Sequence, residues 1–402
     1  MKRTRRVAGG VLLLFFGLGV LCTATARAQE PSRPQPVSAA QLQAAIDKLG
    51  DLKYESRTDA SRLVRRTPAA QAVPALIQAV SNHTDGYVRY RALVLLSGFN
   101  DPRAKDVMRE SLATPNDRLR SVAFNYFEYN PDRALVQTLA NALEKETSEF
   151  VRPALIRALA AAAASFGDPS VRQLLVREAA RGQDFFRSAV IEALGDYKAT
   201  YAAEAIAAIA KLDGPLQSDA VLALGKTGPP TMIGVLAELQ RTAPRQVQPS
   251  IAAAICGLGV NCATHENFLV ETIKFADRNL GFQELLRTAV GGLAALGVAG
   301  RAEVFDPLLT IGVPSRQEST RAPITLALAT IALRNTGLLI SVLEKMADRA
   351  PALELIGEGF DMLEEDYAKE RFFALVRRTY WDSAEASPTR ALMQTLIGKL
   401  DF

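Results

Sequence analysis

Apolar and polar positions alternate along this chain with the period of an α-helix, and the pattern itself repeats. One phrase recurs eight times: usually an aliphatic or aromatic residue, then Arg or Gln, then a helix rich in Ala and Leu. It reads VRYRALVLLSG from Val88, VRPALIRALA from Val151 and LQSDAVLALG from Leu216. A period kept over eight copies predicts an array of structural repeats. The polar second position falls at Arg89, Arg120, Arg152, Arg187, Gln217, Gln248, Arg287 and Arg321, with spacings of 31, 32, 35, 30, 31, 39 and 34 residues.

A second amphipathic helix is predicted between successive copies, because the intervening segments carry residues that end and begin helices. The segments SGFNDPRAKDVM, FEYNPDRALVQTL and ASFGDPSVRQLL each end one helix at Gly or Asn. Each then begins the next helix with Asp or Asn, usually followed by Pro in the first turn. Every unit is therefore predicted to be a hairpin of two helices that are too short to be stable alone. Because stacking buries their apolar faces, we expect an all-α fold, a right-handed α-solenoid of about ten hairpins.

The repeat resembles HEAT repeats, in particular the short HEAT-like variety that is also found in phycobilisome lyases. The resemblance covers residues 68–335 and extends more weakly to about residue 380. Two copies depart from it by carrying Gln217 and Gln248 in place of Arg, and the interval that follows Gln248 is long. The resemblance implies stacked helical hairpins. It says nothing about lyase activity, since one fold serves many functions.

The segments on either side of the repeats are expected to end the solenoid. Residues 39–67 are predicted to form N-terminal capping helices. Residues 336–402 are predicted to hold degenerate repeats and a C-terminal cap, which is more aromatic and more charged than the repeats. Residues 29–38, QEPSRPQPVS, are rich in Pro and are predicted to form a flexible leader.

The first 28 residues have the composition of a targeting segment. Four basic residues precede an apolar run from Val11 to Val20, and small residues at Ala26 and Ala28 suit a cut before Gln29. We favour a cleaved secretory signal, which places the chain in the periplasm or cell envelope. The alternative is an uncleaved anchor that tethers the chain to a membrane as an assembly factor, although the run is short for a span of about 20 residues.

The charge balance argues against a nucleic-acid partner. The whole chain carries a net charge of +4, but five of its basic residues and none of its acids lie in residues 1–28. The rest carries 42 basic and 43 acidic residues, a net charge of −1. A nucleic-acid-binding protein is expected to show a strong basic excess or stripe.

One segment, CGLGVNCATHE, gathers residues that could carry chemistry. Cys256, Cys262, His265 and Glu266 lie within eleven residues. In an oxidising compartment we favour a disulfide between Cys256 and Cys262, because the intervening glycines let the chain fold back. Two free thiols and a zinc site are the alternatives, although structural zinc usually takes four ligands at closer spacing.

The most regular polar feature is a ladder of acidic and basic residues at the starts of the repeated helices. Each acid can cap its helix, and each Arg can pair with its own acid or with an acid of the next unit. We favour a structural role for this ladder, and an anion-binding groove is the alternative. The ladder comprises Asp85, Arg89, Asp117, Arg120, Glu149, Arg152, Asp184 and Arg187.

The sequence therefore predicts a binding scaffold and not an enzyme. The chain holds only two histidines and lacks the motifs of common hydrolases and metalloproteases. We expect no catalytic residues, no metal and no cofactor. We expect a monomer that binds an unidentified protein or peptide along its concave face, with Tyr126 and Tyr129 as candidate interface residues. The competing hypothesis is an enzyme or cofactor-handling module that uses the segment from Cys256 to Glu266.

Overall fold

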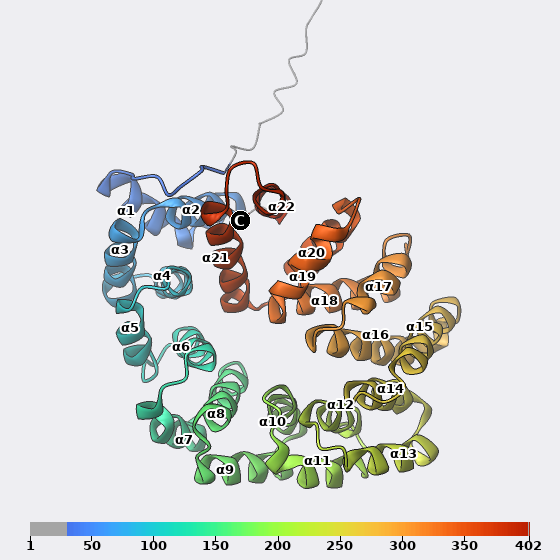
Figure 1. Ribbon diagram of the computed structural model, residues 1–402. Coiled ribbons are helices and arrows are strands. Elements are labelled where there is room, and N and C mark those ends of the chain that lie inside the picture. The colour runs from blue at the N-terminus through green and yellow to red at the C-terminus, as the bar shows by residue number, and fades with distance from the viewer. Residues whose placement is uncertain (1–29, 401) are drawn as a thin grey trace, which may run out of the picture.

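The computed structural model describes residues 30–400 and 402. The regular secondary structure of these residues is entirely helical, without a strand (Figure 1). Ten hairpins follow one another, each made of an odd-numbered helix and the even-numbered helix after it, and the predicted solenoid of HEAT-like hairpins is thereby confirmed. The odd-numbered helices are α1 (Ala39–Asp47), α3 (Ala69–Asn82), α5 (Arg103–Ser111), α7 (Val136–Lys145), α9 (Pro169–Ala180), α11 (Ala203–Ala210), α13 (Met232–Thr242), α15 (Cys262–Arg278), α17 (Phe305–Gly312) and α19 (Thr336–Lys345). The even-numbered helices are α2 (Tyr54–Arg66), α4 (Gly86–Gly98), α6 (Asp117–Tyr129), α8 (Arg152–Phe166), α10 (Asp184–Asp196), α12 (Gln217–Thr227), α14 (Gln248–Gly257), α16 (Gln283–Val298), α18 (Glu318–Arg334) and α20 (Ala350–Met362). Two further helices, α21 (Asp366–Asp382) and α22 (Pro388–Leu400), complete the chain. The predicted targeting segment, residues 1–28, lies outside the described residues.

Helix boundaries fall where the stop and start residues predicted them. Gly167 ends α8 in the left-handed conformation with φ 70°, and Asp168 then caps α9 by accepting hydrogen bonds from the backbone N–H groups of Ser170 and Val171. Pro169 occupies the first turn of α9, where its missing N–H is not needed. The local chemistry of the turns therefore sets the length of each hairpin.

The even-numbered helices from α4 to α18 form an inner row. The odd-numbered helices that precede them form an outer row (Figure 1). Neighbouring inner helices approach closely at small residues. A Cβ atom added to Gly225 of α12 would lie 2.5 Å from Cα of Ala254 in α14. The glycine that ends several copies of the repeat phrase is thus needed for backbone contact between inner helices.

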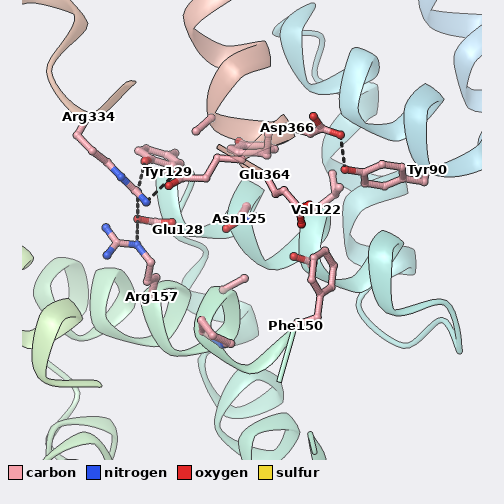
Figure 2. Close-up of a pocket in the computed structure, with 16 residues that line it drawn as sticks. Tyr90, Val122, Asn125, Glu128, Tyr129, Phe150, Arg157, Arg334, Glu364 and Asp366 are labelled. Atoms are coloured by element: carbon pink, nitrogen blue, oxygen red, sulfur yellow. Dashed lines mark hydrogen bonds and ion pairs between the residues drawn. The ribbon is translucent and has the colours of Figure 1, made fainter. Parts of the chain in front are cut away.

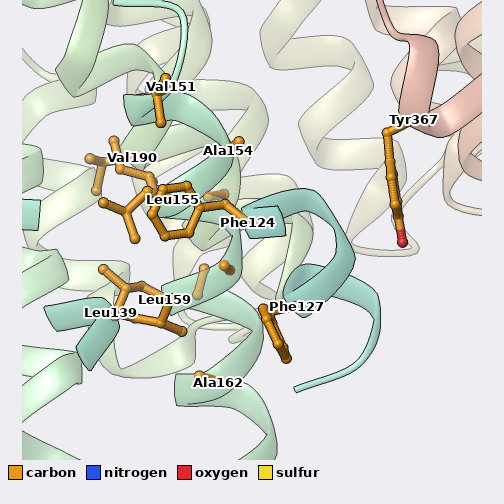
Figure 3. Close-up of a cluster of buried hydrophobic side chains, with 14 of the residues drawn as sticks. Phe124, Phe127, Leu139, Val151, Ala154, Leu155, Leu159, Ala162, Val190 and Tyr367 are labelled. Atoms are coloured by element: carbon orange, nitrogen blue, oxygen red, sulfur yellow. The ribbon is translucent and has the colours of Figure 1, made fainter. Parts of the chain in front are cut away.

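The hydrophobic core is a continuous strip between the two rows and forms two adjoining clusters. Phe124 and Phe127 of α6, which are both 1% exposed, pack with Leu155 and Leu159 of α8 (Figure 3). One residue of this cluster, Tyr367 of α21, comes from the other end of the chain. The C-terminal segment therefore contributes to the N-terminal core.

The array curves until its two ends meet, so that the inner row lies along the concave side of the curve (Figure 1). Helix α21 leaves the repeat path and packs against α4, and it also contacts α6 and α18. Helix α22 packs against α21 and α20. The solenoid is thus closed into a ring by its own C-terminal helices, a feature that the repeat pattern does not announce.

Candidate functional site

One face of α21 holds the ring closed through charged residues. Asp366, Glu370 and Arg377 lie on this face, since spacings of four and seven residues bring side chains to the same side of a helix. Their partners are in the N-terminal part of the chain, between 275 and 347 residues away. We call this contact the ring closure.

The pair of Arg65 and Glu370 forms the centre of the ring closure. Arg65 Nη2 lies 2.6 Å from Glu370 Oε2, and Arg65 Nε lies 3.0 Å from the same oxygen. The two side chains are 8% and 2% exposed, so the pair is desolvated and its bidentate geometry compensates both charges. Gly98 of α4 leaves room for it, because a Cβ atom there would lie 2.7 Å from Glu370 Oε1.

Asp366 joins the first turn of α21 to α4. Its Oδ2 accepts hydrogen bonds from Tyr90 Oη and Arg91 Nη1, both at 2.6 Å. Burial opposes ionisation of Asp366, but Arg91 and Tyr90 outweigh it and hold the pKa of this carboxyl below its usual value. Burial and the neighbouring carboxylate raise the pKa of Tyr90, which is therefore a neutral donor.

The segment predicted to be a flexible leader is part of the ring closure. Glu30 is 5% exposed, and its carboxylate accepts from Arg377 Nε at 2.8 Å and Arg66 Nε at 2.8 Å. Tyr380 and Trp381 donate to the backbone carbonyls of Glu30 and Pro31. The segment predicted to be a flexible leader is thus attached to α21 at Glu30 and Pro31.

A cavity of about 200 Å³ lies where α6, α8 and α18 meet the start of α21 (Figure 2). Glu128, which is 3% exposed, faces it and accepts from Arg157 Nε at 2.8 Å and Tyr197 Oη at 2.9 Å. Arg334 of α18 lies 3.7 Å from the same carboxylate and donates to Tyr129 Oη at 3.0 Å. The lining therefore carries four carboxylate side chains and two guanidinium groups, and the two guanidinium groups lie at Glu128.

These charges continue along the inner row as a chain of ion pairs that the sequence reading missed. Arg157 of α8 also pairs with Asp196 of α10 at 2.9 Å, and Asp196 pairs with Lys226 of α12 at 2.7 Å. We call Arg334, Glu128, Arg157, Asp196 and Lys226 the inner ion-pair chain. Its signal in the sequence is opposite charge about one repeat apart, as between Asp196 and Lys226.

Two further carboxyl groups lie beside the inner ion-pair chain. Glu192 of α10 is exposed to solvent, and Asp219 of α12 accepts a hydrogen bond from Ser188 Oγ at 2.6 Å. Although the Glu192 side chain is exposed, the inner helices around it reduce its hydration, and this effect and the charge of Asp219 raise its pKa. Burial raises the pKa of Asp219. The inner row at α10 and α12 thus offers carboxyl groups that gain from a positively charged neighbour.

The tyrosines predicted as candidate interface residues lie at the ring closure. Tyr129 stacks on Tyr367 of α21 with ring centroids 6.0 Å apart, and the Arg371 guanidinium lies 3.3 Å from the Tyr129 ring centroid. Tyr126 and Tyr129 are both half-buried and line a second cavity of about 230 Å³. The chain's own C-terminal helix occupies much of the surface that these tyrosines would offer.

The predicted acid–base ladder forms only in part. Arg120 pairs with Asp117 at 2.7 Å, and Arg187 pairs with Asp184 at 2.9 Å. Asp85 instead caps α4 through the N–H of Tyr87. Arg152 pairs with Glu178 of the next unit at 2.9 Å, while Glu149 is exposed.

In six of the eight repeat phrases the polar residue has a more uniform role, which is to hold the end of the preceding outer helix; the exceptions are Arg120 and Arg287. Arg89 Nε donates to the carbonyl of Val80 at 2.8 Å, Arg152 Nη1 donates to that of Leu143 at 2.9 Å, and Gln217 Nε2 donates to that of Ala210 at 3.0 Å. The last carbonyls of a helix have no partner within it. Gln can replace Arg here because both side chains supply an N–H donor.

The structure joins Cys256 and Cys262 in a disulfide bond between the end of α14 and the start of α15. Potential ligand atoms of Cys256, Cys262 and Glu266 lie within 4.8 Å of one another. His265 is half-buried, and burial lowers its pKa. The residues gathered in the sequence are thus close together in the fold.

In the part of the chain that the structure describes, no single helix is long and apolar enough to cross a membrane. The bent pair of α18 and α19, with an angle of 111° between the helices, meets the criteria of length and composition.

Comparisons with known proteins were made for the whole chain. A family model described as HEAT repeats matches residues 42–128. Among solved structures, the chain is similar to importin beta in an ammonium sulfate condition, with 14% identity and a TM-score of 0.40 over 88% of this chain and 55% of that one. It spans about half the length of that protein. It is also similar to the complex of CpcE and CpcF of phycocyanin lyase from Nostoc sp. PCC7120, with 18% identity and a TM-score of 0.28 over 83% of this chain and 98% of that one. No curated protein matches the chain.

The repeat phrase, the matched family model and the stacked hairpins lead to one assignment: the chain is a HEAT-like repeat protein.

Proposed function

We propose that this protein is an exported scaffold of the periplasm or cell envelope, and that it binds a protein or peptide segment along the concave face formed by its inner helices. The observation that carries this proposal is the polar surface of the inner row from α8 to α12. It is formed by Arg157, Asp196 and Lys226 of the inner ion-pair chain and by the carboxyl groups of Glu192 and Asp219.

This surface suits a binding role because its charges are already held in place. Each member of the inner ion-pair chain is fixed by at least one neighbour on another helix, so little side-chain entropy is lost when a partner binds. Glu192 and Asp219 favour a partner segment that brings a Lys or Arg side chain. The concave surface of α4 and α6 is covered by α21, so the proposed binding surface is the part of the inner row that α21 leaves uncovered.

The partner's location can be tested by site-specific photo-cross-linking in the native envelope. A benzophenone amino acid at Glu192, on the inner row, should capture a partner. The same group at Gln173, an exposed position on outer helix α9, should capture little. Equal capture at the two positions, or capture at Gln173 alone, would exclude the concave surface as the binding site.

Export is tested by the intact mass of the protein recovered from its envelope fraction. Cleavage after Ala28 gives a chain that begins at Gln29, and the buried position of Glu30 next to it is compatible with a chain that begins there. A mass that includes residues 1–28, in protein recovered only from washed membranes, would instead support the membrane-tethered assembly factor.

A second candidate function is a metal-dependent or cofactor-handling activity of the segment from Cys256 to Glu266. Reduction of the disulfide would make Cys256 and Cys262 available as ligands beside Glu266, and this grouping favours the candidate. Metal analysis of the purified protein decides between the two: one metal ion per chain, lost together with activity on replacing Cys262, would favour the enzyme.

A further inference from the structure

The Cys256–Cys262 disulfide lies on the edge of the fold, in the tight turn between α14 and α15. The turn takes up left-handed conformations at Gly259, with φ 84°, and at Asn261, with φ 45°. It joins an inner helix to the longest outer helix of the array, within the 39-residue interval that departs from the repeat. No contact of the ring closure or of the inner ion-pair chain involves these residues.

The two sulfur atoms differ in their surroundings. Cys256 is 2% exposed and belongs to the core, whereas Cys262 is half-buried at the first position of the 17-residue helix α15. The N-cap residue Asn261 makes no side-chain hydrogen bond to the free N–H groups of α15. A sulfur at such a helix end is stabilised as a thiolate, and the exposed member of the pair is the one that an external thiol can reach.

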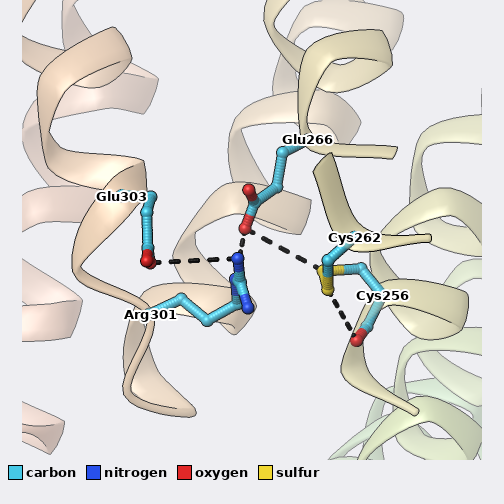
Figure 4. The surroundings of a disulfide bond; sticks show 5 residues. All are labelled: Cys256, Cys262, Glu266, Arg301 and Glu303. Carbon is cyan, nitrogen blue, oxygen red and sulfur yellow. Dashed lines mark hydrogen bonds and ion pairs between the residues drawn. A yellow bond between two sulfur atoms is a disulfide. The ribbon is translucent and has the colours of Figure 1, made fainter. Parts of the chain in front are cut away.

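A carboxylate stands beside the buried sulfur. Glu266 lies one turn along α15 from Cys262, and its Oε1 is 3.9 Å from Cys256 Sγ (Figure 4). The guanidinium of Arg301 contacts the same carboxylate from the loop after α16 and so fixes it in position. Glu266 is thus placed to take the proton that a Cys256 thiol must lose before it can act as a nucleophile.

From this arrangement we infer that Cys256 and Cys262 form an exchangeable disulfide, with Cys262 as the attacked sulfur, Cys256 as the resolving one and Glu266 as the proton acceptor of Cys256. The substrate class is a dithiol, such as a partner protein with two neighbouring cysteines. This activity is independent of the proposed binding along the concave face.

The exchange balances without any further reactant. A partner thiolate attacks Cys262 Sγ, the bond between the two sulfurs breaks, and the electron pair stays on Cys256, which takes up a proton. The partner's second thiol loses its proton and attacks the sulfur that is bound to Cys262. Cys262 then leaves and is protonated. The partner's two thiols become a disulfide, and the chain's disulfide becomes two thiols.

The first test equilibrates the unmodified protein with mixtures of reduced and oxidised glutathione and measures the reduced fraction by alkylation and mass. We expect the disulfide to be partly reduced in mixtures that contain mostly reduced glutathione. Structural disulfides resist reduction by glutathione, and exchangeable disulfides do not. A disulfide that stays fully oxidised in reduced glutathione alone would overturn the inference.

The second test isolates Cys262 with Cys256→Ser and measures the rate of its reaction with an aromatic disulfide reagent across pH. The matched control is Gln173→Cys in a Cys256→Ser, Cys262→Ser background, at an exposed position of helix α9, and both proteins carry Cys22→Ser so that each has one thiol. We expect Cys262 to react about tenfold faster at pH 7, with a midpoint below the usual thiol value of about 8.5. Equal rates and equal midpoints would overturn the inference, as would a reduced chain that retains zinc and whose thiols do not react.

The role of Glu266 is tested with Glu266→Gln, which keeps the shape of the side chain. Closing of the disulfide in the reduced protein by oxidised glutathione should be slower and should shift its pH dependence upward, because Cys256 loses its proton acceptor. A variant with an unchanged pH profile would show that Glu266 only holds Arg301.

Discussion

At the residue scale, the recurring Arg or Gln shows how a sequence period turns into a physical contact. The spacing of these residues was visible in the sequence, and so was the presence of acids nearby. Their main acceptors, however, are carbonyl groups, which leave no trace in the side-chain pattern. Val80, Leu143 and Ala210 share nothing but their place at the end of an outer helix. The sequence could therefore predict that these positions matter but not what they bind.

Arg89 offers the cleanest test of this contact, because its side chain donates to the Val80 carbonyl. Replacing Arg89 with Ala leaves that carbonyl without its donor and should lower the free energy of unfolding by about 1–2 kcal/mol. Arg89→Gln should lower it by less, since Gln217 makes the equivalent bond in another repeat. Urea unfolding followed by circular dichroism measures both changes.

The control for Arg89 is Arg241→Ala, at an exposed position near the end of α13. We expect a change within about 0.5 kcal/mol, as for most surface substitutions. If Arg89→Gln and Arg89→Ala were equally destabilising, the hydrogen bond to the carbonyl would not be the reason for the repeated residue.

At the scale of elements, α21 has contacts that its sequence does not predict. Its charged and aromatic composition is typical of a C-terminal cap. The structure instead buries Glu370 and Arg377 against residues near the other end of the chain. A charged residue in a sequence is expected to be exposed unless its partner is known. Here the partners lie hundreds of residues away and follow no period.

Removing one member of the buried pair of Arg65 and Glu370 is expected to destabilise α21 strongly. Replacing both members with apolar residues is expected to destabilise it much less. Glu370→Ala leaves the Arg65 charge buried without compensation, which should cost about 3–5 kcal/mol at this contact. Replacing both residues with Met should restore most of that loss, because no buried charge remains. Hydrogen exchange of the α21 amides measures the local stability in each variant.

If the double Met variant exchanged as fast as Glu370→Ala, the specific geometry of the pair would matter more than its charge. If neither variant exchanged faster than the unmodified protein, α21 would be held by its apolar contacts alone.

Gly98 tests the same contact from the side of α4. Alanine usually stabilises a helix by up to about 1 kcal/mol relative to glycine. At Gly98 a methyl group would lie 2.7 Å from Oε1 and 3.3 Å from Cγ of Glu370, so Gly98→Ala should loosen α21. At Gly291 in α16, an added Cβ atom would meet no heavy atom within 4 Å beyond its own stretch of helix, so Gly291→Ala should show the usual stabilisation of the helix. Thermal unfolding and hydrogen exchange of α21 should separate the two variants, and equal behaviour would contradict a close contact at Gly98.

At the scale of the whole molecule, the repeats were predictable and the ring was not. Eight copies of a phrase suffice to predict stacked hairpins, since each copy carries its own caps and apolar face. Closure depends on how sharply each hairpin is rotated against the next. That rotation is set by backbone contacts such as Gly225 against Ala254. Small differences at each of these contacts add up over ten hairpins, so no single residue announces the ring.

The ring should open at low pH, because Asp366 holds α21 to α4 as a carboxylate. Its pKa in the folded chain lies below the value of about 3.9 for a free Asp side chain. The stabilisation that it provides is therefore complete above about pH 3.9 and is lost as the pH falls through the lower folded value. Small-angle X-ray scattering should show the largest dimension of the particle increasing in that range, before the helical signal in circular dichroism is lost.

Asp366→Asn cannot form the charged contact at any pH, so its dimension should already be larger at pH 7 and should change less on acidification. Identical scattering of the two proteins from pH 7 to pH 3 would mean that Asp366 does not control closure, and that Glu370 and the buried Glu30 suffice to hold the ring.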